Sequence, residues 1–281
     1  MNRSQEILDY LASDSAHRTV VLAPSAPPVA YAWGEVSIIL SLVMSAGDVM
    51  DTLMVFKTLT AKRELENQAS GTFSFGMRNV GRIRVQYLTQ RGSKVVAVTR
   101  IPFDIPPLDA VCGDPALSAQ VMEAATSESG GIIAVSGTDH EANSAFVYGV
   151  LDVLNHTKRQ IIGIVDNPLT YLMTHRNSIV VQCDVGSDVA TLAEGLTPIM
   201  GLEPRVVYIG GIRSPDEIAT CSCAVRPGGL VIASSRLIDA GTLLSKFTAE
   251  ASTRAEAIEN CVKMAVRITR GPGGKVAVRI A

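Results

Sequence analysis

The second half of the chain repeats a pattern that strongly restricts its fold: short, continuously apolar segments alternate with segments of helical periodicity. Strands that are apolar on both faces must be covered on both faces, which is typical of a parallel sheet with helices on each side. We therefore predict a mostly parallel α/β domain. Its expected strands are Gly131 to Ser136, Gln160 to Val165, Ser178 to Cys183, Arg205 to Ile209 and Leu230 to Ser234, followed by a hairpin formed by Val266 to Thr269 and Lys275 to Ile280 around Gly271 to Gly274.

The first seventy residues have mainly helical spacing. Ile7, Leu8 and Leu11 predict a short amphipathic helix, and a Pro-rich stretch follows it. We then expect a strand from Val29 to Trp33, a helix from Val36 to Ala46 and a second helix from Asp48 to about Glu66.

From Gly71 the period changes to two. Ile83, Val85 and Tyr87 point to one side, as in a half-buried strand. The opposite side carries Arg82, Arg84 and Gln86. A turn at Arg91-Gly-Ser93 leads into a second strand, Lys94 to Arg100. This region predicts a small α+β domain in which helices lie on an antiparallel sheet.

Prolines punctuate Ile101 to Leu108, between the two patterns. Proline removes a backbone donor and keeps the preceding residue extended, so this stretch predicts a linker. We place the small domain at residues 1–100, the Pro-rich linker at 101–115 and the α/β core domain at 116–281.

Composition excludes several classes of protein. The chain of 281 residues is 47% hydrophobic and 19% charged, which excludes a disordered protein, and its net charge of −2 gives no reason to expect a nucleic-acid partner. The longest apolar run, Val36 to Met44, is too short to cross a bilayer, and no signal peptide is expected before Glu6. Five scattered cysteines favour free thiols in a reducing cytosol. A cytoplasmic protein is expected.

Several segments occur in the order and spacing of a known family. The chain resembles the type IV pilus retraction and type II secretion ATPases over nearly its whole length. The resemblance implies a PAS-like small domain followed by a RecA-like P-loop core, and the chain stops where that family usually continues into a C-terminal helical region. It rests on Pro27 to Val36, Gly71 to Phe75, Gly81 to Val85, Gln90 to Gly92, Arg100 to Phe103, Gly130 to Asn155, Ile161 to Asp184 and Glu203 to Ala240.

The segment that corresponds to the phosphate loop is Gly137-Thr-Asp-His-Glu-Ala-Asn-Ser144. A P-loop needs glycines so that backbone N–H groups wrap the phosphates, a lysine on the β and γ phosphates, and a Ser or Thr on magnesium. Gly137 and Ser144 keep their places, but Asn143 stands at the lysine position. Asp139 and Glu141 add negative charge where a polyanion would sit, which costs about 4 kcal/mol per phosphate charge at 4 Å near a protein surface.

The other catalytic positions of the family are also changed. Asp166 is retained, but Thr170 stands at the second acidic position of that segment. Gly211 occupies the Walker B glutamate position, Arg205 the leading aspartate position of the same strand, and Arg236 the position of the family's histidine. Phosphoryl transfer depends on positioning and charge stabilisation, so we assign no catalytic residue. Gly137, Asn143, Ser144 and Asp166 are the candidates for residual nucleotide binding.

In the small domain, four residues match arginines of the family, some of which in active members reach toward the nucleotide at the subunit boundary: Arg82, Arg84, Arg91 and Arg100. The resemblance makes Arg82, Arg84 and Arg100, with Arg213 after the Walker B strand, candidates for interface or trans-acting arginines. The alternative is a solvated strand face with ordinary surface ion pairs.

Other chemistry has weak support. Cys221 and Cys223 are too close in sequence for the usual zinc spacing, and His17, His156 and His175 have no partner at ligand spacing. Three consecutive residues such as Asp139 to Glu141 rarely converge on one ion, so no metal site is assigned. No Gly-x-Ser-x-Gly elbow is present.

These observations lead to one principal hypothesis. The protein is a catalytically inactive secretion-ATPase-like protein with an assembly or regulatory role, which needs no cofactor. Its expected partners are further copies or an active paralogue in a ring, and an inner-membrane platform protein through which it is held at the membrane. The alternatives are an active ATPase motor that binds ATP and magnesium in a non-standard site, and a regulatory module that binds another ligand in the old cleft.

Overall fold

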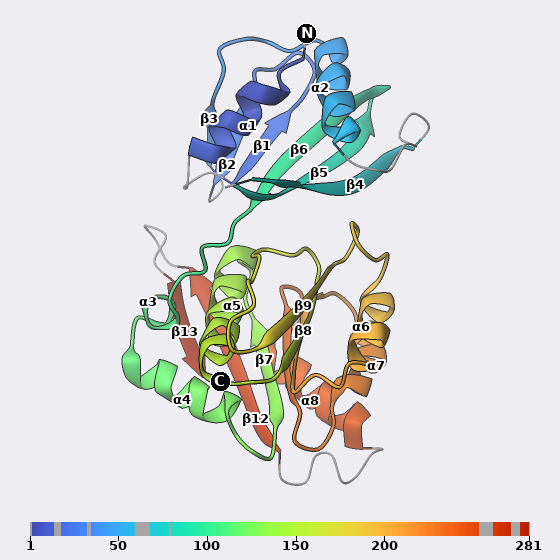
Figure 1. Ribbon diagram of the computed structural model, residues 1–281. Coiled ribbons are helices and arrows are strands. Elements are labelled where there is room, and N and C mark those ends of the chain that lie inside the picture. Colours follow the sequence, from blue (N-terminus) through green and yellow to red (C-terminus); the bar gives the residue numbers. More distant parts are fainter. Residues whose placement is uncertain are drawn as a thin grey trace. The chain divides into compact units, whose positions relative to one another are not determined.

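The computed structural model describes residues 2–13, 18–32, 35–59, 68–78, 80–252, 261–270 and 276–280 (Figure 1). The chain divides into two compact units, Met1–Pro102 and Phe103–Ala281. Within the described residues every helix is too short or not apolar enough to cross a lipid bilayer.

The first unit is a six-stranded antiparallel sheet with two helices on one face (Figure 1). Ile83, Val85 and Tyr87 are buried beneath the helices, as their alternation predicts. The strand order is β3-β2-β1-β6-β5-β4. The elements are α1 (Ser4–Ser13), β1 (Thr19–Leu22), β2 (Val29–Ala32), β3 (Glu35–Ile38), α2 (Ala46–Thr58), β4 (Ser70–Met77), β5 (Gly81–Gln90) and β6 (Ser93–Ile101).

The predicted helix from Val36 to Ala46 is wrong. Its first residues form the edge strand β3, in which Val36 pairs with Tyr31 of β2 and Ile38 pairs with Val29. The β-branched residues suit the pleated edge, and both remain mostly exposed. The helix begins only at Ala46, because Ser45 and Asp48 form a capping box there.

Other predicted boundaries in this unit fall on residues that the structure leaves undescribed. The expected helix from Asp48 to about Glu66 is observed as α2, and residues 60–67 lie outside the described part. Trp33, at the end of the expected strand, also lies outside it, as does His17.

The second unit confirms the predicted α/β class. Its seven-stranded sheet has the order β13-β12-β7-β11-β10-β8-β9 and is parallel except for β13, which is antiparallel to β12. This is the predicted hairpin, and its connecting residues 271–275 lie outside the described part. The strands are β7 (Gly131–Ser136), β8 (Ile161–Asp166), β9 (Ile179–Asp184), β10 (Val206–Ile212), β11 (Leu230–Ser235), β12 (Val262–Arg270) and β13 (Val276–Ile280).

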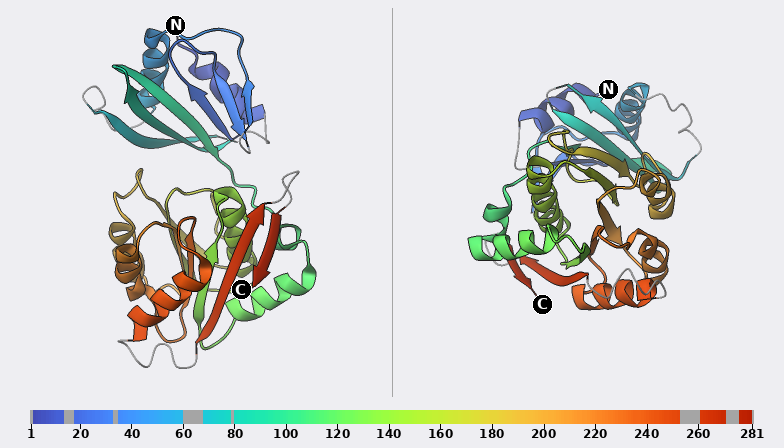
Figure 2. Two further views of the ribbon diagram at one scale, coloured as in Figure 1. Left: turned by 180° about the vertical axis from the view of Figure 1, so that it is seen from behind. Right: turned by 60° about the horizontal axis from the view of Figure 1, so that its bottom comes forward.

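Helices cover both faces of this sheet, which explains why its strands are continuously apolar (Figure 2). One face carries α3 (Leu108–Cys112), α4 (Pro115–Ala125) and α5 (His140–Thr157). The other carries α6 (Leu192–Met200), α7 (Pro215–Cys221), the short η1 (Ser222–Ala224) and α8 (Ala240–Ser252). Helix α3 lies within the stretch expected to be a linker, yet Leu108 and Val111 pack in the core of this unit.

Candidate functional site

The segment expected to be the phosphate loop connects β7 to α5. Asp139 is the N-cap of α5, and its carboxylate Oδ1 accepts a hydrogen bond from the Ala142 N–H at 3.0 Å. The other oxygen, Oδ2, pairs with Nε of Arg270 at the end of β12. A helix N-terminus attracts anions through its free N–H groups and its dipole. Here the chain's own carboxylate holds that position, with an arginine as counter-ion.

Asn143, at the position expected to carry the lysine, is directed back onto the loop. Its side chain is 2% exposed, and its Nδ2 donates to the Gly137 carbonyl at 2.8 Å. Gly137 is tightly surrounded, because a Cβ at this position would lie 2.3 Å from the Ile268 carbonyl oxygen and 2.5 Å from Asn143 Oδ1. The loop is therefore closed by contacts within the chain.

Ser144 is also bonded within the chain. It is fully buried, and its Oγ lies 3.1 Å from Oγ1 of Thr170. Oγ1 of Thr170 lies in turn 3.0 Å from Nε2 of His140. The hydroxyl expected to face magnesium thus belongs to a network of side-chain hydrogen bonds that connects α5 with the loop after β8.

Asp166 ends β8 and is fully buried. Its carboxylate accepts from the hydroxyls of Tyr148 at 3.1 Å and Tyr208 at 3.4 Å, and from the Asn167 N–H at 2.9 Å. Burial raises the pKa of both tyrosines well above the ordinary value, and the Asp166 charge raises it further. The two tyrosines therefore remain protonated donors that stabilise the carboxylate.

The two tyrosines and Arg270 are site residues that the sequence interpretation missed. Tyr148 stands four residues after Ser144 on α5, so the i, i+4 relation was a usable signal that both face the same way. Tyr208 lies in the middle of the predicted strand that became β10. Arg270 is 131 residues from Asp139, and no local sequence signal connects the two.

The Walker B glutamate position has no room for a side chain. Gly211 has a φ of +74°, and a Cβ there would lie 2.1 Å from the Asn167 carbonyl oxygen. Only glycine adopts this conformation without strain. Arg205 directly precedes the first residue of β10, and its Nη2 donates to the carbonyls of Ser127 and Glu128. Its role there is to fasten the loop that precedes β7.

The candidate arginines have different environments. Arg213 is exposed, and its Nη2 donates to Asn167 Oδ1 at 2.9 Å. Arg82 and Arg100 are half-buried in the first unit, whereas Arg84 is only 4% exposed. The alternative of a solvated strand face is therefore wrong for Arg84. Arg236, at the position expected for the histidine, is exposed after β11.

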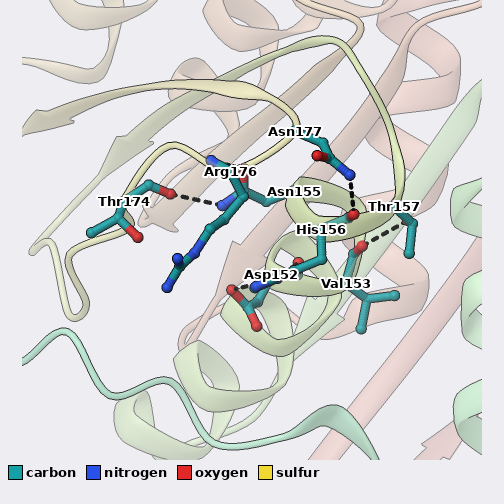
Figure 3. Close-up of polar contacts among 8 residues, drawn as sticks. All are labelled: Asp152, Val153, Asn155, His156, Thr157, Thr174, Arg176 and Asn177. Carbon is teal, nitrogen blue, oxygen red and sulfur yellow. Dashed lines mark hydrogen bonds and ion pairs between the residues drawn. The ribbon is translucent and has the colours of Figure 1, made fainter.

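The residues considered for metal binding have other partners or lie apart. Nδ1 of His175 accepts from the Val180 N–H at 3.1 Å, and His156 lies beside Asp152 at the end of α5 (Figure 3). Cys221 is buried, which raises the pKa of its thiol to about 12, while Cys223 is exposed. Within the described ranges no group of three His, Cys, Asp or Glu side chains is arranged to hold a metal ion.

The chain has similarities to known proteins. No protein-family model matches it. It is 22% identical over 221 residues to the type IV pilus ATPase PilU of Pseudomonas aeruginosa, covering 79% of this chain and 56% of that protein. It is also 22% identical over 225 residues to the type IV pilus retraction ATPase PilT of the same organism, covering 77% of this chain and 64% of that protein. The chain is thus similar in sequence to type IV pilus ATPases.

Two solved ATPase structures share the fold. A crystal structure of the pilus retraction motor PilT with bound ADP matches with a TM-score of 0.78 at 22% identity, covering 100% of this chain and 82% of that one. The ATPase DotB of Legionella pneumophila matches with a TM-score of 0.70 at 13% identity, covering 100% and 81%. The chain spans only 56% and 64% of the length of the two pilus ATPases named above.

Proposed function

We propose that the protein is a catalytically inactive relative of the pilus and secretion ATPases, with an assembly or regulatory role in a type IV pilus or a type II or type IV secretion-like system. The observation that carries this proposal is the Asp139 carboxylate at the N-terminus of α5, held there by Arg270. In a working P-loop that helix end receives the phosphates of the nucleotide.

Charge gives a nucleotide no net attraction at this site. The Asp139 carboxylate would repel a phosphate and the Arg270 guanidinium would attract it, and the ion pair that they form has no net charge. Asn143 supplies no compensating charge, and its amide already donates to Gly137. Arg270 offers a positive charge, but Asp139 already neutralises it.

The hydrolytic side of the site supports the same proposal. Hydrolysis needs an accessible side chain beside the γ-phosphate that positions or deprotonates the attacking water. Asp166 is fully buried and accepts bonds from two tyrosines, and the backbone at Gly211 excludes a glutamate. No described side chain at these positions is left to act as the base.

We further propose that the protein works in an assembly. The resemblance to ring-forming ATPases supports self-association or a mixed ring with an active paralogue, and an inner-membrane platform protein as a further partner. Arg82, Arg100 and Arg213 are the proposed interface residues. No ATP, magnesium or nucleic acid is needed for this role, and a cytoplasmic location follows from it.

An active motor with a non-standard site is the alternative, and kinship with PilT and PilU supports it. Isothermal titration calorimetry of the purified protein with ATP and magnesium distinguishes the inactive protein from the active motor. We expect no binding in the micromolar range. A micromolar dissociation constant that is lost in Ser144→Ala, with the fold intact by circular dichroism, would favour the motor.

A further inference from the structure

An open groove lies on the face of the second unit that carries α3, α4 and α5. Its volume is about 540 Å³, and its lining comes from these three helices and the residues just before α3. The apolar part includes Ile105, Leu108, Met122 and Val153, and two carboxylates, Asp109 and Asp152, also line it. Ligand pockets span about 300 to 1,000 Å³, so several large side chains fit here.

The groove is a fixed feature of this unit. Leu108 and Val111 of α3 are buried in the core, and α5 approaches α3 closely at Gly149. A Cβ at Gly149 would lie 3.2 Å from Leu108 Cα, which is tighter than most real contacts. Ser118 of α4 donates to Asp109 of α3 and fastens these two helices together.

The chain segment that builds this face is strongly acidic. Between residues 101 and 157 the sequence has eight acidic residues and neither lysine nor arginine, although the whole chain has a net charge of only −2. Besides the two that line the groove, three further carboxylates adjoin lining residues in the sequence and are exposed. They are Asp104 beside Ile105, Asp114 beside Pro115, and Glu123 beside Met122.

Most basic side chains of the neighbouring strands point to the other face of the sheet, whereas Arg270 of β12 faces the helices and is paired with Asp139. On β12, Met264 and Val266 pack under α3 to α5, so the alternating Lys263 and Arg267 face the opposite side. Arg279 of β13 pairs with Arg267 and lies on that side too. Lys263, Arg267 and Arg279 therefore do not neutralise the carboxylates around the groove.

The first basic residues after this acidic segment lie at the C-terminal end of α5. Lys158 and Arg159 follow α5, and Arg176 lies in the loop that Asn155 fastens beside the helix end (Figure 3). None of the three is among the residues that line the groove. His156 lies 3.4 Å from the Asp152 carboxylate and faces the same helix end (Figure 3).

We propose that this groove docks a basic amphipathic helix of a partner protein. The apolar stripe of such a helix would fill the space over Leu108, Met122 and Val153, as in other complexes where a helix lies in a groove. Its flanking lysines or arginines would meet Asp109 and Asp152. Carboxylates around the groove would attract such a segment over a distance and reject acidic ones. The inference is independent of whether the phosphate loop binds nucleotide.

A synthetic probe tests the proposal directly. We would measure the fluorescence anisotropy of a labelled peptide of about 14 leucine and lysine residues with its leucines on one helical face, and of a scrambled isomer without an apolar face. The full chain should bind the amphipathic peptide about 10-fold or more tightly than the scrambled one, and less tightly in high salt. Equal binding of the two peptides, or no binding, would overturn the proposal.

Two variants of α4 provide the matched control. Ala119 and Gln120 are adjacent and both exposed, but only Ala119 lines the groove. Ala119→Lys should weaken peptide binding about 10-fold by placing a like charge in the groove, and Gln120→Lys should change it by less than about 3-fold. Circular dichroism and thermal midpoints would verify that both variants fold. Equal effects of the two substitutions would show that the peptide binds elsewhere.

Two further outcomes count against a partner helix. If n-octylammonium binds in the groove and the peptide does not, the occupant is a small amphiphilic cation. If sedimentation shows that the wild type self-associates and that Ala119→Lys but not Gln120→Lys abolishes it, the occupant is a second copy. Either result would overturn the proposal.

Discussion

Arg270 of β12 forms an ion pair with Asp139, the residue that caps the first turn of α5. The two residues are 131 positions apart, so the pair ties the end of the parallel sheet to the loop expected to bind phosphate. It supplies within the chain both the negative and the positive charge that a P-loop obtains from its nucleotide and its lysine. The charges at this helix end are therefore paired within the chain.

The cap and the ion pair make separable contributions to stability. Asp139→Asn keeps an acceptor for the Ala142 N–H and removes the charge, so it should lower the free energy of unfolding by no more than about 1 kcal/mol, because both side chains are partly exposed. Asp139→Ala removes the cap as well and should cost about 0.5 to 2 kcal/mol more. Urea unfolding measures both. Equal losses for the two variants would contradict a capping role.

Restoring the family's residues should not restore turnover. Asn143→Lys places an amino group at a position that is 2% exposed, and Gly211→Glu requires a side chain where φ is +74°. We expect the Gly211 change to cost about 1 to 3 kcal/mol and the double variant to release no phosphate from ATP. Gly76→Ala is the control, because a Cβ there meets nothing within 4 Å. Phosphate release by the double variant would show that the missing lysine and glutamate alone make the site inactive.

The buried tyrosines should be needed for the stability of the Asp166 cluster. Tyr148→Phe or Tyr208→Phe removes a donor from a fully buried carboxylate and should lower the free energy of unfolding by about 1 to 3 kcal/mol. Tyr31→Phe is the control, because Tyr31 is 49% exposed and should change stability by less than about 0.5 kcal/mol. If all three variants were equally stable, the hydroxyl contacts with Asp166 would be energetically unimportant.

The same tyrosines predict a loss of stability in alkali. Their pKa is raised in the folded state, so above the ordinary value of about 10 the unfolded chain loses protons that the folded chain retains. Their contribution is complete below pH 10 and decreases as the pH rises further. Unfolding at pH 9 and pH 11 should show a larger decrease for the wild type than for Tyr148→Phe/Tyr208→Phe. An equal decrease would contradict the raised pKa values.

Association should depend on the half-buried arginines of the first unit. Arg82→Glu and Arg100→Glu should weaken self-association or joining to an active paralogue in sedimentation experiments. Arg78→Glu, at an exposed residue of the turn after β4, is the control and should leave both association and thermal midpoint nearly unchanged. Arg84→Glu is unsuitable because Arg84 is buried, and it should lower the thermal midpoint. A wild type that remains monomeric with every partner would remove the assembly role.

The sequence predicted the parallel core well because strands that are apolar on both faces must be covered on both faces, and few arrangements other than a parallel sheet between helices do this. The predicted bounds of strand β7, Gly131 to Ser136, agree with the structure, whereas the segment from Val36, predicted to be a helix, begins with a strand. A short apolar run has no periodicity that separates an edge strand from a helix, so the pairing with β2 decided its structure. In the site, Asn143 and Gly211 were identifiable by position. The Asp139–Arg270 pair was not, because tertiary folding alone brings these residues together.

Phosphate release from ATP is the most direct measurement of the central claim. The purified full chain, assayed with magnesium and millimolar ATP, should show no turnover above a buffer blank, and Ser144→Ala should be indistinguishable from the wild type. Magnesium-dependent phosphate release by the wild type that Ser144→Ala abolishes would contradict the account, because it would require the closed loop between Gly137 and Ser144 to open and bind nucleotide.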